Sequence, residues 1–270
     1  MSKTSAAPVR ILVLAKYVPD AQFPRHFDAQ HRLERTESIL SELDEYAVEV
    51  ALQLSEEHGG DKESPVTVLT LGGEAASAAV KKALQMGATD GVHVLDDAVA
   101  GSDALATSRV LESAVRRLEP DLVITGMAST DAETGVIPSM LAARLGWPQL
   151  TLAASVQLSE DATTISAQRD EDGVSLSMTS QLPAVVSVTD QVGEPRYPNF
   201  KSILAARKKP VQTLSLADLG LSPDLVGPTG SAVTVLQAGD VPARPAGRVI
   251  VDDGEAGLAL VDFLADRKLL

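Results

Sequence analysis

Short apolar runs alternate with segments of helical periodicity over the first 125 residues, and this alternation most constrains the fold. The four apolar runs have the character of buried strands and are Val9–Lys16, Val66–Leu71, Gly91–Leu95 and Asp121–Thr125. Three segments between them carry apolar residues at helical spacing: Glu45–Leu54, Ala75–Met86 and a segment from Ser102 to about Leu118. Strands that alternate with helices predict a doubly wound, mostly parallel sheet with helices on both faces.

Residues at the ends of these segments support their limits. Gly59 and Gly60 stop the first helix, and Gly87 suits the left-handed position after the second. Ser102 is a candidate N-cap of the third helix because its hydroxyl can accept from the first backbone amides.

The pattern changes after Pro148. Four short runs follow, separated by turn residues: Leu152–Leu158, Thr164–Gln168, Val174–Ser180 and Ala184–Val188. Asp172-Gly173 is a strong hairpin signal. These runs predict a small antiparallel extension of the α/β domain.

The C-terminal part has little periodicity of its own. Five prolines and scattered leucines occupy residues 210–245, and only Glu255–Lys268 has helical spacing. Such a segment either docks on a partner or folds back on its own domain. We expect a core domain over residues 1–209 and an extended arm over 210–270 that docks on a partner.

Composition excludes several classes of protein. The net charge of −14 disfavours nucleic-acid binding, which needs basic patches. The chain has no cysteine, so disulfides, thiolate clusters and cysteine nucleophiles are excluded. No apolar run reaches the roughly 20 residues that span a bilayer, and the first eight residues lack a signal-peptide pattern. We therefore expect a cytoplasmic protein without membrane insertion.

A polar loop follows the fourth predicted strand. Gly126–Ile137 contains three hydroxyl side chains and the carboxylates Asp131 and Glu133, and it leads into a predicted helix. Ligands of open α/β sheets bind at such strand ends, where backbone amides at a helix start can bind anions. The alternative is an ordinary polar loop with Asp131 as a helix cap. The loop lacks the Gly-Lys-Ser/Thr ending of a P-loop, so we expect no nucleotide hydrolysis.

Other chemistry is not indicated. The four histidines are dispersed without metal-site spacing, and no Gly-x-Ser-x-Gly elbow occurs. We expect a binding subunit without catalytic residues of its own rather than an enzyme.

Several segments together resemble the beta subunit of electron transfer flavoprotein, in its bacterial form. The similar segments occur in the family's order and are Asp44–Glu49, Ala83–Ala88, Gly126–Pro148, Gln168–Asp170, Leu182–Val186 and Glu194–Tyr197, followed by Ile203 and Lys208. Each motif alone is weak, but their order and spacing over about residues 9–268 are specific.

The resemblance implies a heterodimer with an alpha subunit that holds most of a redox FAD, while this chain buries AMP as a structural ligand. Carried over by position, the AMP site comprises Leu14, Ser41, Glu42, Leu43, Asp44, Leu71, Gly126, Met127, Ala128, Ser129, Thr130, Asp131, Ala132, Glu133, Thr134, Gly135, Val136 and Ile137. Asp170 corresponds to a carboxylate near the FAD and the alpha subunit.

The resemblance also implies docking of flavin dehydrogenases of the acyl-CoA dehydrogenase type, as in fatty acid β-oxidation. Electrons then pass to a membrane-bound quinone reductase. The docking residues implied are Glu194, Pro195, Arg196, Tyr197, Phe200 and Ile203.

The chain departs from the family pattern at several of these positions. Ser41-Glu42 replaces a usual Asn-Pro, Asp170 is a short carboxylate, and Phe200 stands where a leucine anchor is usual. Two alternatives stay open: an electron-bifurcating flavoprotein with a second FAD in this site, and a stand-alone adenine-nucleotide sensor. The loop 131–136 lacks the fuller Asp-Gly-Asp-Thr-x-Gln run of the bifurcating branch, and a sensor leaves Glu194–Tyr197 and the arm unexplained.

Overall fold

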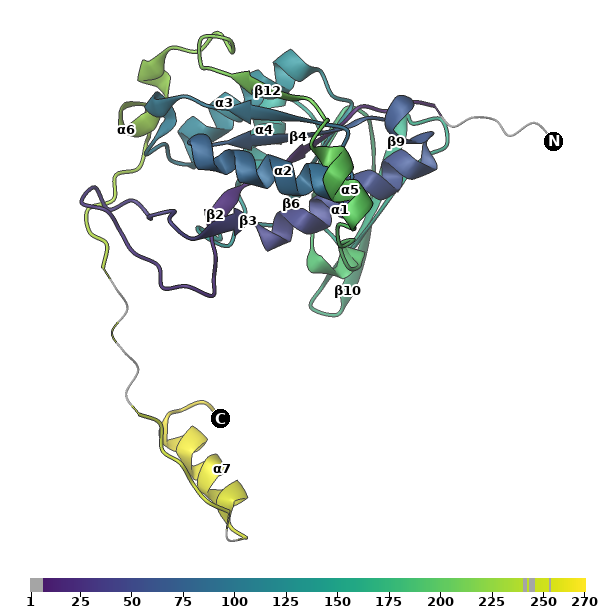
Figure 1. Cartoon of the computed structure of the whole chain (residues 1–270). Helices are drawn as coiled ribbons and strands as arrows, with labels where there is room; N and C mark the ends of the chain where they lie inside the picture. The colour runs from purple at the N-terminus through teal and green to yellow at the C-terminus, as the bar shows by residue number, and fades with distance from the viewer. Residues whose placement is uncertain (1–6, 240–241, 243–245, 253) are drawn as a thin grey trace, which may run out of the picture. The chain divides into compact units, whose positions relative to one another are not determined.

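A seven-stranded sheet forms the centre of the larger of two units in the computed structural model, which describes residues 7–239, 242, 246–252 and 254–270 (Figure 1). Its strands are β1 (Ile11–Leu14), β4 (Val66–Leu71), β5 (Asp90–Val94), β6 (Leu122–Gly126), β7 (Gln149–Ala153), β11 (Ala184–Val188) and β12 (Val211–Leu214). The order is β12-β5-β4-β1-β6-β11-β7, and every neighbouring pair is parallel. Along the chain, β4 and β5 follow β1 on one side of it, and β6 then pairs with β1 on the other side. The direction in which strands are added therefore reverses beside β1.

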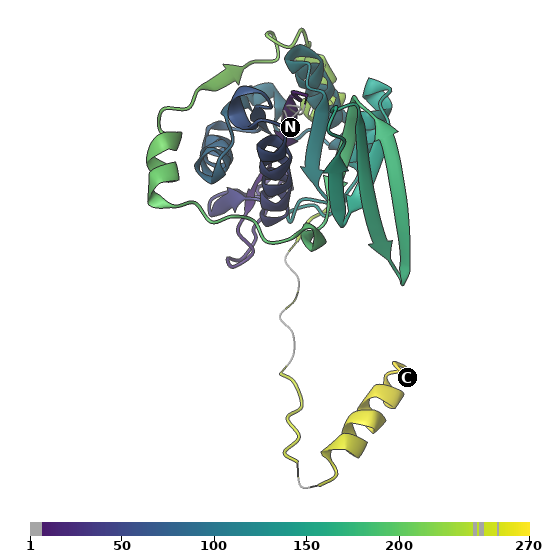
Figure 2. The ribbon, with the colours of Figure 1, turned by 90° about the vertical axis from the view of Figure 1, so that its right-hand side faces the viewer.

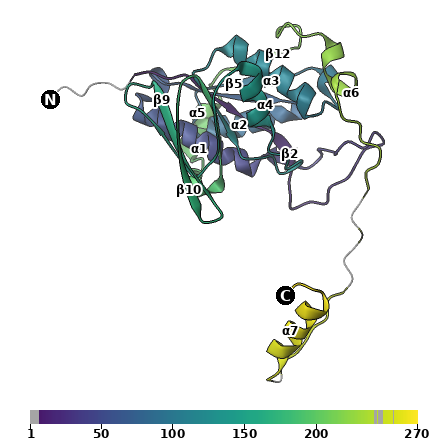
Figure 3. The same cartoon turned by 180° about the vertical axis from the view of Figure 1, so that it is seen from behind.

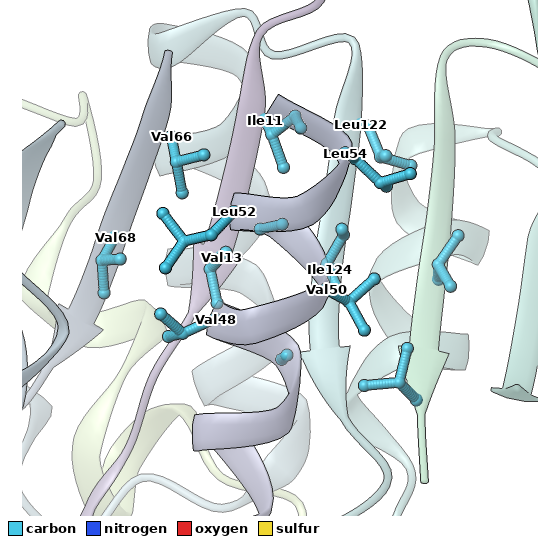
Figure 4. Close-up of a cluster of buried hydrophobic side chains, with 14 of the residues drawn as sticks. Ile11, Val13, Val48, Val50, Leu52, Leu54, Val66, Val68, Leu122 and Ile124 are labelled. Atoms are coloured by element: carbon cyan, nitrogen blue, oxygen red, sulfur yellow. The ribbon is translucent and has the colours of Figure 1, made fainter. Parts of the chain in front are cut away.

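Helices cover both faces of this sheet, as the sequence predicts. Helices α1 (Glu42–Glu57) and α2 (Ser77–Met86) cover one face, and α3 (Ala104–Leu118) and α4 (Ile137–Leu145) cover the other (Figure 3). Successive side chains of a strand point to opposite faces. Ile11 and Val13 of β1 thus pack with α1 and α2, whereas Leu12 and Leu14 pack with α3 and α4. Figure 4 shows the first cluster, in which Val13 lies beside Val48 and Leu52 of α1 and Ile124 lies beside Val50 of the same helix.

The predicted antiparallel extension is present as a three-stranded sheet of β8 (Ser155–Leu158), β9 (Thr164–Glu171) and β10 (Val174–Gln181). Asp172 and Gly173 form its tight turn with φ of 49° and 79°, both in the left-handed region that such a turn needs. The run Ala184–Val188 was expected in this extension, but it forms β11 of the parallel sheet. All five of its residues are buried, as in a strand covered on both faces.

Two further segments connect these layers. The short strands β2 (Tyr17–Pro19) and β3 (Ser38–Leu40) pair, and residues 20–37 make a long excursion between them. After β11, the chain passes through η4 (Asp190–Val192) and α5 (Phe200–Ala206) on its way to β12 at the opposite edge of the sheet, a path visible in Figure 2. Residues 194–209 carry the docking residues predicted from the sequence, and we call this segment the docking strap.

The larger unit extends beyond the predicted boundary at residue 209 and ends at Ala238. Strand β12 pairs with β5, and Leu214 and Leu216 are buried in the core. The first part of the predicted arm, including η5 (Pro223–Leu225) and α6 (Gly227–Gly230), thus folds back on its own domain. This packing also corrects the helix cap: Asp103 caps α3, while the Ser102 hydroxyl accepts from the Gly227 amide.

The second unit, Gly239–Leu270, contains α7 (Ala256–Asp266). Leu258, Leu260 and Val261 of this helix are more than half exposed.

Three short 3-10 turns also belong to the larger unit: η1 (Gly60–Lys62), η2 (Glu74–Ala76) and η3 (Asp97–Val99). Within the described ranges, no helix is both long and apolar enough to cross a membrane.

Candidate nucleotide-binding site

The loop after β6 begins where the strand order reverses, the place where open α/β sheets bind ligands. Gly126 is the last residue of β6, and it packs against the first turn of α1. A Cβ at Gly126 would lie 2.7 Å from the Leu43 carbonyl oxygen and 2.8 Å from Asp44 Oδ1. Only glycine therefore fits. The structure thus brings together Leu43, Asp44 and Gly126, three of the residues predicted for one site.

Asp44 joins the ends of β1 and β6. Its buried carboxylate accepts a hydrogen bond of 2.8 Å from the Lys16 amide. Burial raises the pKa of Asp44 to about 7, although the amides of Lys16 and Gly126 favour the charged form. This carboxyl group therefore titrates near neutral pH.

Asp131 is the charged centre of the loop. Its side chain is only 3% exposed and forms ion pairs with Lys16 at 3.0 Å and Arg35 at 2.6 Å. Burial raises its pKa, but the charge of Lys16 and hydrogen bonds from Arg35, Ser129 and Lys16 outweigh this and hold the pKa well below its usual range. The alternative role of Asp131 as a helix cap is wrong, because Val136 occupies the N-cap of α4 and no side chain caps it.

The excursion 20–37 supplies cations to this loop. Arg25 donates to the Thr130 carbonyl at 2.8 Å, and Arg35 also donates to the Tyr17 carbonyl at 2.7 Å. Lys16, Arg25 and Arg35 are not among the residues predicted for this site, since they lie about a hundred residues before the loop. The available signal was the lysine at the carboxyl end of the first predicted strand.

Unpaired hydrogen-bonding groups surround the same strand ends. Within the described residues, the buried hydroxyls of Ser41 and Thr70 have no hydrogen-bond partner. Thr70 faces the same side of the sheet as Val68, the side of α1, because side chains alternate along a strand. The amides of Thr134 and Gly135 also donate to no acceptor in the part of the chain described. Buried polar groups are nearly always paired, so the two hydroxyls fit a polar ligand such as a nucleotide. The two amides lie in the exposed part of the loop and are open to solvent or to a ligand.

The remaining predicted positions differ in how closely they belong to this site. Leu14 and Leu71 pack in the α3–α4 cluster at the ends of β1 and β4. Glu42 is exposed at the start of α1, and residues 132–136 are exposed along the loop. Asp170 is exposed on β9, on the antiparallel sheet rather than on the strand ends.

The predicted docking residues lie together on the docking strap but have different surroundings. Tyr197 and Phe200 are 90% and 77% exposed, whereas Ile203 is half-buried on α5. Arg196 instead turns inward, where Glu49 and Glu56 of α1 bind its guanidinium. Glu194 is exposed and Pro195 is half-buried.

Among the described residues, no group of three or more His, Cys, Asp or Glu side chains could hold a metal ion.

Comparison with known proteins points to one family. The family model "Electron transfer flavoprotein domain" matches residues 32–219, which include both the loop and the docking strap. "Electron transfer flavoprotein subunit beta" of Mycobacterium tuberculosis is 41% identical over 265 residues, which cover 96% of this chain and 99% of the relative. "Caffeyl-CoA reductase-Etf complex subunit CarD" of Acetobacterium woodii is 30% identical over 97% of this chain and all of the relative. The resemblance seen in the sequence is thus confirmed, and the chain belongs to the electron transfer flavoprotein beta-subunit family.

Proposed function

We propose that this chain pairs with an alpha subunit to form an electron-carrying heterodimer, in which it binds AMP at the loop Gly126–Ile137. Its role in the pair is structural and electrostatic, because the chemistry resides in an FAD held mainly by the alpha subunit. Near-full-length similarity to relatives named as beta subunits supports this assignment.

One observation carries the AMP assignment: the crowded glycine beside unpaired hydroxyls. Gly126 allows the chain to approach α1 with no room for a Cβ, while Ser41 and Thr70 hold buried hydroxyls without partners. These hydroxyls and the amides of the loop would hold the nucleotide's polar groups. Glycine at this position allows β6 to approach α1 closely, which brings the start of the loop to the start of α1, where Ser41 lies.

The charge around the loop also suits a phosphate. Asp131 would repel an anion if its charge were free, but Lys16 and Arg35 both pair with it. Arg25 adds a further cation at the Thr130 carbonyl. The side chains of Lys16 and Arg35 are about 40% exposed, so they reach solvent beside the loop while still neutralising Asp131.

When bound, FAD supplies the electron-transfer chemistry of the heterodimer. This chain's part is to shape the flavin's surroundings, and Asp170 is the carboxylate that we assign to the alpha-subunit side. It is exposed on β9 and therefore accessible to a partner.

The docking strap would receive flavin dehydrogenases of the acyl-CoA dehydrogenase type, from which electrons reach a membrane quinone reductase. Its two aromatic side chains, Tyr197 and Phe200, are exposed in this chain. Exposed aromatics in such a position are typical anchors of protein interfaces.

A second candidate is a beta subunit with FAD in place of AMP. The full-length similarity to the CarD subunit of a caffeyl-CoA reductase–Etf complex supports this second candidate. The test is mass spectrometry of the ligand released by denaturing the purified chain. AMP supports the first proposal, FAD supports the second, and neither nucleotide would refute both.

A further inference from the structure

The docking strap is attached to the helices beneath it at both ends. Residues 194–209 contain no strand, and their one helix, α5, has only seven residues. Helices of this length are not stable alone. Its position is therefore set by contacts with the rest of the domain: α5 packs on α2, Pro198 is buried, and the polar contacts at the two ends of the strap fix where it begins and ends.

The first attachment is Arg196. Its Nε and Nη2 donate to the two carboxylate oxygens of Glu49 at 2.8 and 3.0 Å, and its own backbone amide donates to Glu49 at 3.0 Å. Nη1 and Nη2 also donate to Glu56 at 2.5 and 3.3 Å. Glu49 and Glu56 lie seven residues apart on α1, which places them two turns apart on one face. Paired, two-pronged bonds of this kind are strong and geometrically specific.

The second attachment is Lys209. Its ammonium donates to the carbonyl oxygens of Gly87 at 2.8 Å, Ala88 at 2.6 Å and Leu84 at 3.3 Å. These carbonyls lie at the end of α2, where a cation is favoured by the helix dipole. All three donors of the ammonium are used.

The two exposed aromatics lie between these attachments. The Tyr197 ring lies 5.5 Å from the Lys82 ammonium of α2, and Asn199 caps α5 by accepting from the Ser202 amide at 3.0 Å. Phe200 begins α5 and projects into solvent. Because these rings bury little surface within the chain, they cannot themselves hold the strap.

We infer that Arg196 and Lys209 are positioning residues that clamp the docking strap to α1 and α2 and so present Tyr197 and Phe200 in a fixed arrangement. The inference rests on the proposed docking function and adds how the surface is preorganised. The partner surface that fits it is an apolar pocket for the two rings. A strap fixed in advance loses less entropy when it binds.

Arg196, predicted from the sequence as a docking residue, thereby becomes a positioning residue. A direct contact with a partner carboxylate would require its guanidinium to leave two acidic side chains, one of which, Glu49, has a side chain only 9% exposed. An unpaired buried carboxylate is costly. Arg196 thus acts through the strap, and the aromatics contact the partner.

The test measures amide hydrogen exchange over residues 197–205 in the complex with the alpha subunit. The variants are Arg196→Gln and Lys209→Met, with Glu57→Gln and Lys208→Met as controls, because Glu57 and Lys208 are exposed neighbours. Both test variants should exchange about tenfold faster, a change expected when one charge-assisted contact is lost. The controls should match the wild type, and unchanged exchange in both test variants would overturn the inference.

A kinetic readout separates positioning from docking. With a reduced acyl-CoA dehydrogenase as the probe, Arg196→Gln should raise the half-saturating dehydrogenase concentration severalfold while the rate at saturation stays the same. Arg196→Lys should recover part of the loss. If Arg196→Gln impairs folding, Glu56→Gln removes only the outer half of the clamp and should show the same effect more weakly. Faster exchange with unchanged half-saturation would overturn the positioning role, whereas unchanged half-saturation in Phe200→Ala would instead refute the docking function.

Discussion

Asp44 Oδ1 occupies the space that a side chain at Gly126 would need, 2.8 Å from the position of a Cβ there. This contact joins the first turn of α1 to the end of β6, so the nucleotide loop starts from a backbone position fixed by the core.

Substitution of Gly126 by alanine should displace the loop. The added methyl would meet the Leu43 carbonyl at 2.7 Å as well as Asp44, and we expect a loss of about 1–3 kcal/mol in the free energy of unfolding. Gly126→Val should also reduce nucleotide content and assembly with the alpha subunit. Gly73→Ala is the matched control, since nothing lies within 4 Å of a Cβ there. Equal nucleotide content in the Gly126 and Gly73 variants would contradict the assignment.

The buried carboxyl of Asp44 should make stability depend on pH. Burial raises its pKa from 3.8 to about 7, so the folded state binds a proton that the unfolded state releases between these values. Its contribution should fall by up to about 1.4 kcal/mol per pH unit as pH rises towards 7, and level off above that. Urea unfolding at pH 5, 6, 7 and 8 measures this as the difference between wild type and Asp44→Asn. A difference that is constant with pH would show that Asp44 does not titrate in this range.

Replacing Asp131 by asparagine should release the loop from its two cations. The ion pairs with Lys16 and Arg35 involve a carboxylate that is almost fully buried, and hydrogen bonds to charged groups contribute roughly 1.5–3 kcal/mol. We expect a lower melting temperature and lower nucleotide retention. Glu57→Gln, which changes an exposed carboxylate outside the loop, should change neither. If the two variants behave alike, Asp131 does not organise the loop.

Truncation of Phe200 should affect partner binding without affecting stability. Its ring is 77% exposed, so Phe200→Ala should leave the melting curve unchanged and cost about 1–4 kcal/mol of dehydrogenase binding in a coupled assay. Leu214→Ala provides the contrast, because this side chain is buried and its loss should cost about 2–5 kcal/mol of stability. Normal coupled rates with Phe200→Ala would end the docking proposal.

The second unit should become protected from protease when the alpha subunit binds. Helix α7 exposes its apolar side chains within this unit, and a helix of eleven residues is marginal alone. Trypsin should cut at Arg248 and Arg267 in the isolated chain and more slowly in the heterodimer. Equal cleavage in both states would place the contact with the alpha subunit elsewhere.

The fold could be predicted where local patterns are decisive. Continuous apolar runs such as Val66–Leu71 mark strands covered on both faces, and Asp172-Gly173 has the backbone freedom that its turn requires. The placement of β11 and β12 could not be predicted in this way. Their short runs suit either kind of sheet, and the choice depends on distant pairing with β6 and β5.

The same distinction holds for the site. The loop is recognisable because its glycines, hydroxyls and carboxylates are adjacent in sequence. Its cations come from distant positions: Lys16 follows β1, and Arg35 reaches Asp131 from the excursion 20–37. The inward turn of Arg196 also depends on α1 packing beneath the strap.

The ligand of the loop provides the most direct test of the account. The heterodimer should be purified without added nucleotide, denatured, and its released ligands quantified by mass spectrometry against the chain concentration. We predict AMP at about one per beta subunit, together with FAD at about one per heterodimer. Two FAD per heterodimer with no AMP, or no adenine nucleotide other than one FAD, would contradict the assignment of AMP to Gly126–Ile137.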